Sequence, residues 1–116
     1  MTAAVLRGEV YAARLGWGEG SEQAGSRPVL VVGNDLFNEV MPVLTIVPLT
    51  TRRPGRELHP AEVLVSKGET GLRAESIALA HQIRTVARSR IGRRIGRLDE
   101  QTMALVSVAL RLHLAL

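Results

Sequence analysis

Residues 42–51 read PVLTIVPLTT, a β-branched run, rich in Val, Ile and Thr, that holds two prolines. Residues 28–33 read PVLVVG, a shorter apolar run between a proline and a glycine. Short runs of this kind, rich in Val, Ile and Thr and bounded by Pro or Gly, are typical of buried strands. Both runs therefore predict core strands. Pro48 lies inside the longer run and predicts an edge position or a bulge, because proline donates no hydrogen bond to a neighbouring strand.

Further strands and one short helix are expected around these two runs. Asn34 and Asp35 can cap a turn of helix that runs through Val40. Glycine-rich or proline-containing connections predict loops at residues 16–26 and 52–60 and a turn at 67–72. Alternating apolar residues predict strands at residues 9–15, 61–66, 75–84 and 91–98.

The C-terminus carries the strongest helical pattern. Asp99 is a good N-cap, Glu100 suits the positive end of the helix dipole, and Leu98 and Met103 stand at the positions of a hydrophobic staple. The helix has two apolar lines, one formed by Met103, Val106, Leu110 and His113 or Leu114, the other by Leu105, Val108, Leu112 and Leu116. Because so wide an apolar surface needs two partners, we expect the helix to pack on its own barrel and on another chain or a second copy.

The fold class expected from these elements is mainly β, a small antiparallel barrel or sheet with one C-terminal α-helix. The 116 residues make one domain, residues 1–116. The chain has no cysteine, which excludes disulfides, thiolate zinc sites and a cysteine nucleophile. No apolar run approaches the ~20 residues of a membrane span, so we expect no membrane partner and a cytoplasmic location.

The charge is basic and uneven. The formal net charge is +4, and fourteen of the fifteen basic residues are arginines. Residues 1–50 carry three arginines and five acids, whereas residues 51–116 carry twelve basic and six acidic residues. Arginine suits phosphate recognition, so the composition favours a polyanion such as nucleic acid. A solvated basic face, or the composition of a GC-rich genome, would explain the same charge.

The inventory of catalytic motifs is narrow. His59, His81 and His113 lie far apart in the sequence, so no metal-ligand spacing is present, and we expect no cofactor. Neither a phosphate-binding G-x-x-x-x-G-K loop nor a G-x-S-x-G elbow occurs. Trp17 can stack on a base or cover the core, and the sequence leaves both open.

Three polar segments stand where predicted strands begin or end. They are GSEQAGSRP at residues 20–28, PLTT at 48–51 and HQIRT at 81–85. Strand ends that converge on one rim can form a site. Each segment also has a structural interpretation, in which Glu22 and Arg27 only fasten a loop, the two threonines only favour a strand, and Arg84 belongs to a solvated face.

Together these segments resemble the MazF/PemK family of toxins from bacterial toxin–antitoxin modules. The resemblance runs from Arg7 to about Leu114 and rests on several motifs in register. In chain order they are RGEVY at 7–11, GSEQAGSRPVLVV at 20–32, NDLFN at 34–38, PLTT at 48–51 and SIALAHQIRT at 76–85.

The resemblance implies an SH3-like barrel of the PemK and CcdB type that forms a homodimer. It implies a metal-independent, sequence-specific endoribonuclease toxin of a type II system, of the mRNA interferase type. Such an enzyme cleaves single-stranded RNA through the 2′-hydroxyl, leaves a 2′,3′-cyclic phosphate and a 5′-hydroxyl, and stops translation. The implied partners are the RNA substrate and a cognate MazE-like antitoxin with an acidic tail.

The resemblance also assigns roles to residues. Arg27 matches the catalytic arginine, Thr50 the threonine that binds a phosphate oxygen, and Glu22 a residue proposed as the base. His81 stands where many relatives carry Asp or Glu, which leaves the identity of the general base open. The residues expected to contact RNA are Gln23, Ser26, Thr51, Ser76, His81, Gln82 and Arg84.

Two other functions fit the same pattern. One is a non-enzymatic toxin that poisons gyrase as CcdB toxins do, and the other is an inactive family member that binds RNA or antitoxin. Arg27 and Thr50 in register argue against the gyrase poison, and His81 is the feature that favours the inactive member. The RNA recognition sequence and the RNA class that is cut are not predicted from these residues.

Overall fold

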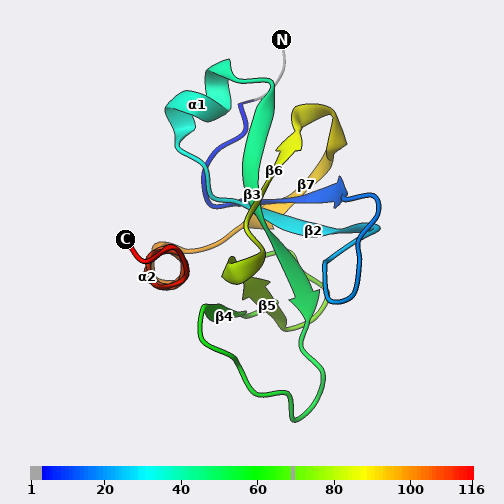
Figure 1. The fold of residues 1–116 in the computed structure, drawn as a ribbon, viewed down its shortest axis with the longest axis vertical. Helices are drawn as coiled ribbons and strands as arrows, with labels where there is room; N and C mark the ends of the chain where they lie inside the picture. The colour runs from blue at the N-terminus through cyan, green and yellow to red at the C-terminus, as the bar shows by residue number, and fades with distance from the viewer. Residues whose placement is uncertain (1–3, 69) are drawn as a thin grey trace.

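The computed structural model describes residues 4–68 and 70–116, and within them an antiparallel β-structure carries a long C-terminal helix (Figure 1). Two short 3₁₀ turns lie between strands, η1 (Ala80–Gln82) and η2 (Arg88–Arg90). The helices are α1 (Asp35–Val40) and α2 (Glu100–Leu114). The strands are β1 (Glu9–Arg14), β2 (Ser26–Val31), β3 (Val43–Thr51), β4 (Glu62–Val65), β5 (Ser76–Leu79), β6 (Arg84–Ala87) and β7 (Ile91–Arg97). The expected class, mainly β with a C-terminal helix, is confirmed.

The strands follow the order β4-β5-β3-β2-β1-β7, and β6 also pairs with β3. The long strand β3 belongs to two sheets. Val43–Ile46 pair with β6, and Leu49–Thr51 pair with β5. Because β6 leads through η2 directly into β7, which pairs with β1, the chain curls back on itself as in an SH3-like barrel.

Two hydrophobic clusters lie on opposite faces of the β1–β2–β3 sheet. Alternate residues of the same strand enter different clusters: Val10 and Leu30 face one, Tyr11 and Val29 face the other. The first cluster is completed by β4, β5 and α2, and the second by Leu44, Ile46 and Val86. This arrangement explains why residues 28–33 are continuously apolar and why Thr45 is the one polar residue in 42–49, since strands covered on both faces have no solvent side.

The position of Pro48 differs from the prediction. Its strand is central, not an edge strand, and Pro48 pairs with Val29 of β2. On the other side of β3, the ladder with β6 ends at Ile46 and the ladder with β5 begins at Leu49. Pro48 therefore lies between the end of the β6 ladder and the start of the β5 ladder, so its missing N–H interrupts neither of them.

The single strand predicted at residues 75–84 is also wrong. The segment forms β5, then η1, and only then β6. The two strands pair with different parts of β3, so the chain must bend between them. The apolar alternation continues through the bend, which is why the pattern alone does not reveal it.

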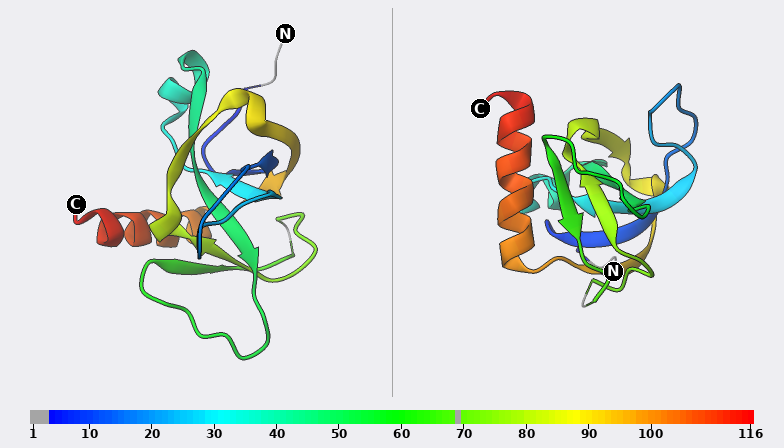
Figure 2. Two further views of the ribbon diagram at one scale, coloured as in Figure 1. Left: turned by 45° about the vertical axis from the view of Figure 1, so that its right-hand side comes forward. Right: turned by 90° about the horizontal axis from the view of Figure 1, so that it is seen from below.

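Helix α2 begins as predicted, with the Asp99 Oδ1 atom accepting the Thr102 N–H at 2.7 Å. Its inner line buries Val106 and Ala109 in the first cluster. Its outer line is more than half exposed, at Leu105, Val108, Leu112 and Leu116. Figure 2 shows α2 along one side of the sheets, whereas the β1–β2 loop projects from the opposite side.

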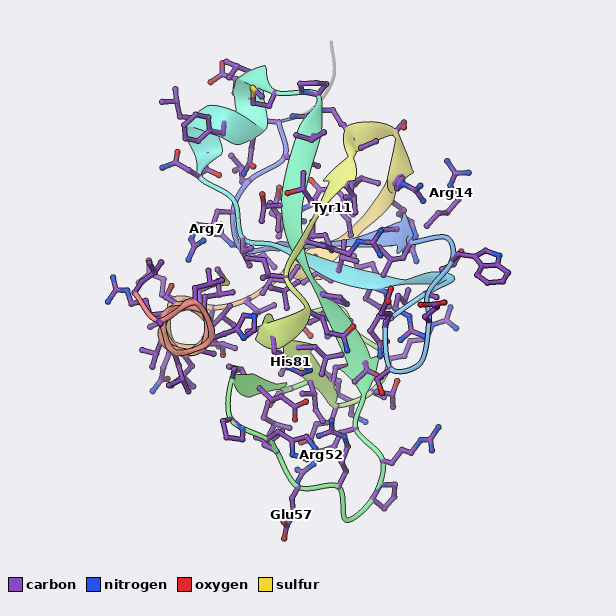
Figure 3. The ribbon with its side chains drawn as sticks, in the orientation of Figure 1. Arg7, Tyr11, Arg14, Arg52, Glu57 and His81 are labelled. Atoms are coloured by element: carbon purple, nitrogen blue, oxygen red, sulfur yellow. The ribbon has the colours of Figure 1, made fainter. Side chains whose placement is uncertain are left out.

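Arg7 connects α1 to α2 and lies between them in Figure 3. Its backbone N–H donates to Asp35 Oδ1 at 2.6 Å. Its guanidinium donates to Ser107 Oγ at 2.8 Å and to the Val32 carbonyl. One arginine thus joins the end of β2 and the two helices that flank it.

A carboxylate at Glu9 is buried beside β7, and its side chain accepts three hydrogen bonds. Oε2 accepts from Arg94 Nε at 2.5 Å, while Oε1 accepts the Leu6 N–H at 2.7 Å and the Tyr11 hydroxyl at 3.0 Å. Burial acts to raise the pKa of Glu9, but these donors outweigh it and hold the pKa below 4.5. Burial and the bond to Glu9 raise the pKa of Tyr11 to about 12, so the phenol stays a donor at neutral pH.

Substituting Glu9→Gln should lower the free energy of unfolding at pH 7 by about 1–3 kcal/mol, because Arg94 and the amide of Leu6 lose a charged acceptor. Since the pKa of Glu9 is lower in the folded chain than the 4.5 of a free carboxyl, ionised Glu9 stabilises the fold above that pH. That contribution is lost as the pH falls through the folded pKa. Urea unfolding at several pH values should show the two proteins converging below pH 4.5. A constant difference across the acid range would contradict this assignment.

Candidate active site

The β1–β2 loop, residues 15–25, is closed by backbone hydrogen bonds at its base. The Leu15 N–H donates to the Gly25 carbonyl at 2.8 Å, and the Gly25 N–H donates to the Gly16 carbonyl at 2.9 Å. Gly16 and Gly25 both have φ of +73°, a conformation that other residues rarely adopt. Further out, the Glu22 N–H donates to the Glu19 carbonyl at 3.0 Å. The glycines of this segment thus fold the loop into a defined shape.

Gln82 ties this loop to η1. Its Oε1 atom accepts the Gln23 N–H at 2.9 Å, and its Nε2 atom donates to the Ser21 carbonyl at 2.9 Å. The bend that divides the predicted strand at 75–84 is what carries Gln82 to the loop. Two of the three polar segments, GSEQAGSRP and HQIRT, therefore meet directly.

Arg27 stands half-buried at the start of β2 and is held from the same loop. Its Nε donates to the Ala24 carbonyl at 2.9 Å, and its Nη1 donates to the Gln23 side chain. The β2–β3 ladder ends at the pair Val29–Pro48, and Arg27 and Thr50 each lie two residues from that pair along their own strands. The third segment, PLTT, therefore runs toward the same end of the sheet as the arginine.

Two hollows of about 520 and 480 Å³ lie on either side of the Gln23–Gln82 contact. They share Ser21, Gln23, His81 and Gln82, so they form two ends of one groove. His81 is exposed on η1 and borders both ends (Figure 3). We call the first the Trp17 end and the second the Thr50 end.

The two ends of the groove differ in charge. The Trp17 end is completed by Trp17, Glu19, Glu22 and Arg84. The Thr50 end is completed by Thr50, Thr51, Arg53, Arg56, His59, Glu62 and Leu79. The first combines an aromatic ring with two carboxylates and one guanidinium group, and the second combines two hydroxyls with two guanidinium groups and the carboxylate of Glu62.

The structure places most of the predicted site residues at this groove. Arg27 contacts it through Gln23, while Glu22, Gln23, Thr50, Thr51, His81, Gln82 and Arg84 line it. Two predicted RNA contacts lie elsewhere. Ser76 is buried, with its Oγ donating to the Ala74 carbonyl at 3.0 Å, and Ser26 is exposed at the start of β2 but lines neither end. The roles of all ten residues stay predictions.

Four polar residues of the Thr50 end were not predicted, namely Arg53, Arg56, His59 and Glu62. Arg56 binds both carboxylate oxygens of Glu62 at 2.8 and 3.0 Å, and the His59 N–H donates to Glu62 Oε1 at 2.8 Å. The hydrogen bonds from Arg56 hold the pKa of Glu62 below 4.5 despite burial. The cluster of three arginines and one histidine in residues 52–59 is the sequence feature that could have predicted this part of the groove.

The arginine-rich segment 84–97 does not form one surface. Arg84 lines the Trp17 end, but Arg88 donates to the Asn38 and Met41 carbonyls and Arg90 to the Arg14 carbonyl. Arg94 pairs with the buried Glu9. Within residues 4–68 and 70–116, no three His, Asp or Glu side chains gather as a metal site. No helix in the same residues has the length and apolarity to cross a membrane.

Residues 6–114 match the family model of the PemK-like, MazF-like toxins of type II toxin–antitoxin systems. The chain belongs to this family. MazF-family relatives match it over nearly their whole length. Endoribonuclease EndoA of Bacillus subtilis is 38% identical over 112 residues, which cover 97% of this chain and 96% of the relative. Endoribonuclease MazF9 of Mycobacterium tuberculosis is 38% identical over 115 residues, covering 95% and 96%.

Solved structures agree with the family assignment. A mycobacterial endoribonuclease in complex with its cognate antitoxin superposes with a TM-score of 0.79, at 29% identity, covering 97% of both chains. The family match and the full-length endoribonuclease relatives make this chain a MazF-like endoribonuclease toxin. The gyrase-poison and inactive-member alternatives are not favoured by these relatives.

Proposed function

We propose that this MazF-family toxin cleaves single-stranded RNA at short specific sequences, without a metal ion, in the groove between the β1–β2 loop and η1. The observation that carries the proposal is the position of Arg27, which Gln23 and Ala24 hold beside the groove, two residues along β2 from the Val29–Pro48 pair that leads to Thr50. A guanidinium held beside a groove that also carries the Thr50 hydroxyl is suited to bind a phosphate that gains negative charge.

The reaction uses the 2′-hydroxyl of the substrate as the nucleophile. A base removes its proton, the 2′-oxygen attacks the adjacent phosphorus, and the bond from phosphorus to the 5′-oxygen breaks as that oxygen takes a proton from water. The products are a 2′,3′-cyclic phosphate and a 5′-hydroxyl, so the protein forms no covalent bond. Arg27 stabilises the negative charge on the phosphorane and on the departing oxygen, and Thr50 donates to a phosphate oxygen.

Glu22 is the base in this proposal. It lines the Trp17 end, where its carboxylate is exposed to a substrate in the groove. His81 borders both ends and is the second candidate for the base. The pH dependence of the cleavage rate of Glu22→Gln and His81→Gln variants separates the two candidates. In the variant that lacks the base, the rate should no longer rise with pH on the acidic side of the profile.

The test of this function is cleavage of a long RNA in excess EDTA, followed by mapping of the fragment ends. Discrete cuts that carry 5′-hydroxyls and 2′,3′-cyclic phosphates are expected. Cleavage that requires added Mg²⁺, or fragments with 5′-phosphates, would refute the metal-free mechanism. The same map reveals the recognition sequence.

We further propose that the chain is a homodimer and that a cognate antitoxin with an acidic segment binds it. The exposed apolar line of α2 is a surface that a second copy would cover, because so many large side chains on one helix face are rare on a monomer. Sedimentation should give twice the mass of the chain. A Val108→Asp, Leu112→Asp double variant should sediment as a monomer, whereas the adjacent Arg111→Ala should not. A parent protein that stays monomeric at micromolar concentration would refute the dimer.

A further inference from the structure

Trp17 is 92% exposed, although it is the one tryptophan of the sequence and tryptophans are highly buried on average. It does not cover the core, which settles one of the two alternatives that the sequence left open. The other aromatic side chains are a buried Tyr11 and a partly exposed Phe37 on α1. An indole left in water beside a groove is available for a ligand.

The loop holds the backbone beside Trp17 in a defined position. Gly18, the next residue, lies so close to the far side of the loop that a Cβ there would be 3.0 Å from the Glu22 carbonyl oxygen and 3.2 Å from the Ala24 Cβ. Gln82 fastens the outer part of the loop, and the Leu15–Gly25 and Gly25–Gly16 bonds fasten its base. Because the loop is already ordered, a ligand that stacks on Trp17 does not have to order it.

The charges at the Trp17 end favour a base over a phosphate. Glu19 and Glu22 line this end together with Arg84, so two carboxylates stand beside one guanidinium. At the Thr50 end two guanidinium groups stand beside one carboxylate, Glu62, which Arg56 binds. The Trp17 end is therefore the less favourable of the two for a phosphate group. The Glu19 carboxylate, which the proposed reaction does not use, can accept a hydrogen bond from an exocyclic amino group, which cytosine, adenine and guanine carry and uracil lacks. The hollow of about 520 Å³ has room for a nucleotide.

We infer that the Trp17 end is a base-binding subsite, in which a nucleobase of the RNA stacks on the Trp17 indole and a base with an exocyclic amino group is preferred. The inference rests on the proposed cleavage of RNA in the same groove. The subsite makes Trp17 a specificity-determining residue rather than a catalytic residue.

The lone tryptophan makes the test direct, because all tryptophan fluorescence comes from the subsite. Titration with short RNA that is 2′-O-methylated throughout measures binding without cleavage, since the nucleophile is blocked. Cytosine or adenine oligomers should quench the fluorescence and bind at least several-fold more tightly than uracil oligomers. An abasic oligomer of the same length should quench little. Equal quenching by abasic and base-bearing oligomers would overturn the subsite, and equal affinity for uracil oligomers would overturn the amino-group preference.

Steady-state cleavage kinetics of Trp17 variants provide a second, independent test. Trp17→Ala should raise KM by about 5- to 150-fold, the loss expected for one base–aromatic stack, with kcat changed less than about threefold. Trp17→Phe should recover most of the loss, and Phe37→Ala, which removes the exposed aromatic ring of α1, should leave KM unchanged. An unchanged KM in Trp17→Ala would overturn the inference while leaving the proposed cleavage intact. Absence of cleavage by the parent protein would instead refute the proposed function, and the fluorescence arm still tests the subsite.

Discussion

Substitution of Arg27 by alanine is expected to reduce kcat/KM for RNA cleavage by about 10³-fold or more. The Arg27 guanidinium, which Ala24 and Gln23 hold beside the groove, carries the charge stabilisation that the phosphorane needs in the proposed mechanism. A bidentate donor that is already bound to Ala24 and Gln23 needs no reorganisation when the negative charge develops. Single-turnover cleavage of a defined RNA measures the effect on the chemical step.

Two further variants separate chemistry from structure. Arg27→Lys keeps the charge but loses the planar fork, so it should recover only a small part of the rate. Gln23→Ala removes the acceptor that positions Arg27 and should lower kcat more than it raises KM, with a smaller loss than Arg27→Ala. The Arg27 variants should still bind 2′-O-methylated RNA and unfold at a similar urea concentration. A fully folded Arg27→Ala protein that cleaves within tenfold of the parent rate would remove Arg27 from the mechanism.

Substitution of Gly96 by alanine is expected to destabilise the fold by about 3 kcal/mol or more. A Cβ at this position would lie 2.0 Å from the Thr70 carbonyl oxygen and 2.6 Å from its carbonyl carbon. The same two segments meet at Gly71, where a Cβ would lie 2.3 Å from the Ile95 carbonyl oxygen and where φ is +78°. Two backbones touch here without side chains between them, so neither can move aside without disturbing the pairing of β7 with β1.

Gly68→Ala is the matched control for this effect. Gly68 lies in the same turn, but no atom comes within 4 Å of a Cβ placed there, and its backbone is not in the left-handed region. Its substitution should change the free energy of unfolding by less than about 0.5 kcal/mol. Thermal and urea unfolding measure both variants, and insoluble expression of Gly96→Ala alone would agree with the prediction. Equal stability of the two variants would show that the turn relaxes freely.

The elements that depend on local pattern were predictable from the sequence. The runs at 28–33 and 42–51, the Asn34 cap and the whole of α2 follow from apolar periodicity and capping residues, and the structure confirms them. The errors arise where two distant segments decide the outcome. Pro48 is tolerated because β6 and β5 meet beside it, and the segment 75–84 bends because its halves pair with different parts of β3. Neither fact is encoded in the segment itself.

The candidate site likewise combines features that a local pattern predicts with features that depend on distant segments. Motifs at strand ends predicted that Gln23, Thr50 and Gln82 would lie near one another, because strand ends converge on a rim. The loop at 52–60 was predicted as a loop, yet its contribution to the groove depends on the Arg56–Glu62 pair, which brings together residues that carry no local pattern. Ser76 belongs to a matching motif but is buried, since all four residues of β5 are covered.

The pairing of β1 with β7 has a consequence for the order in which the protein is made. Strand β1 lies between β2 and β7, which ends at Arg97, and the cluster around Val10 is completed by Val106 of α2. During synthesis the sheet therefore cannot close before Arg97 has left the ribosome, and the cluster cannot close before Val106 has. Because η1 packs against α2, the groove reaches its final shape only after that helix has been made. Ribonuclease activity is thus expected to appear late in the synthesis of this domain.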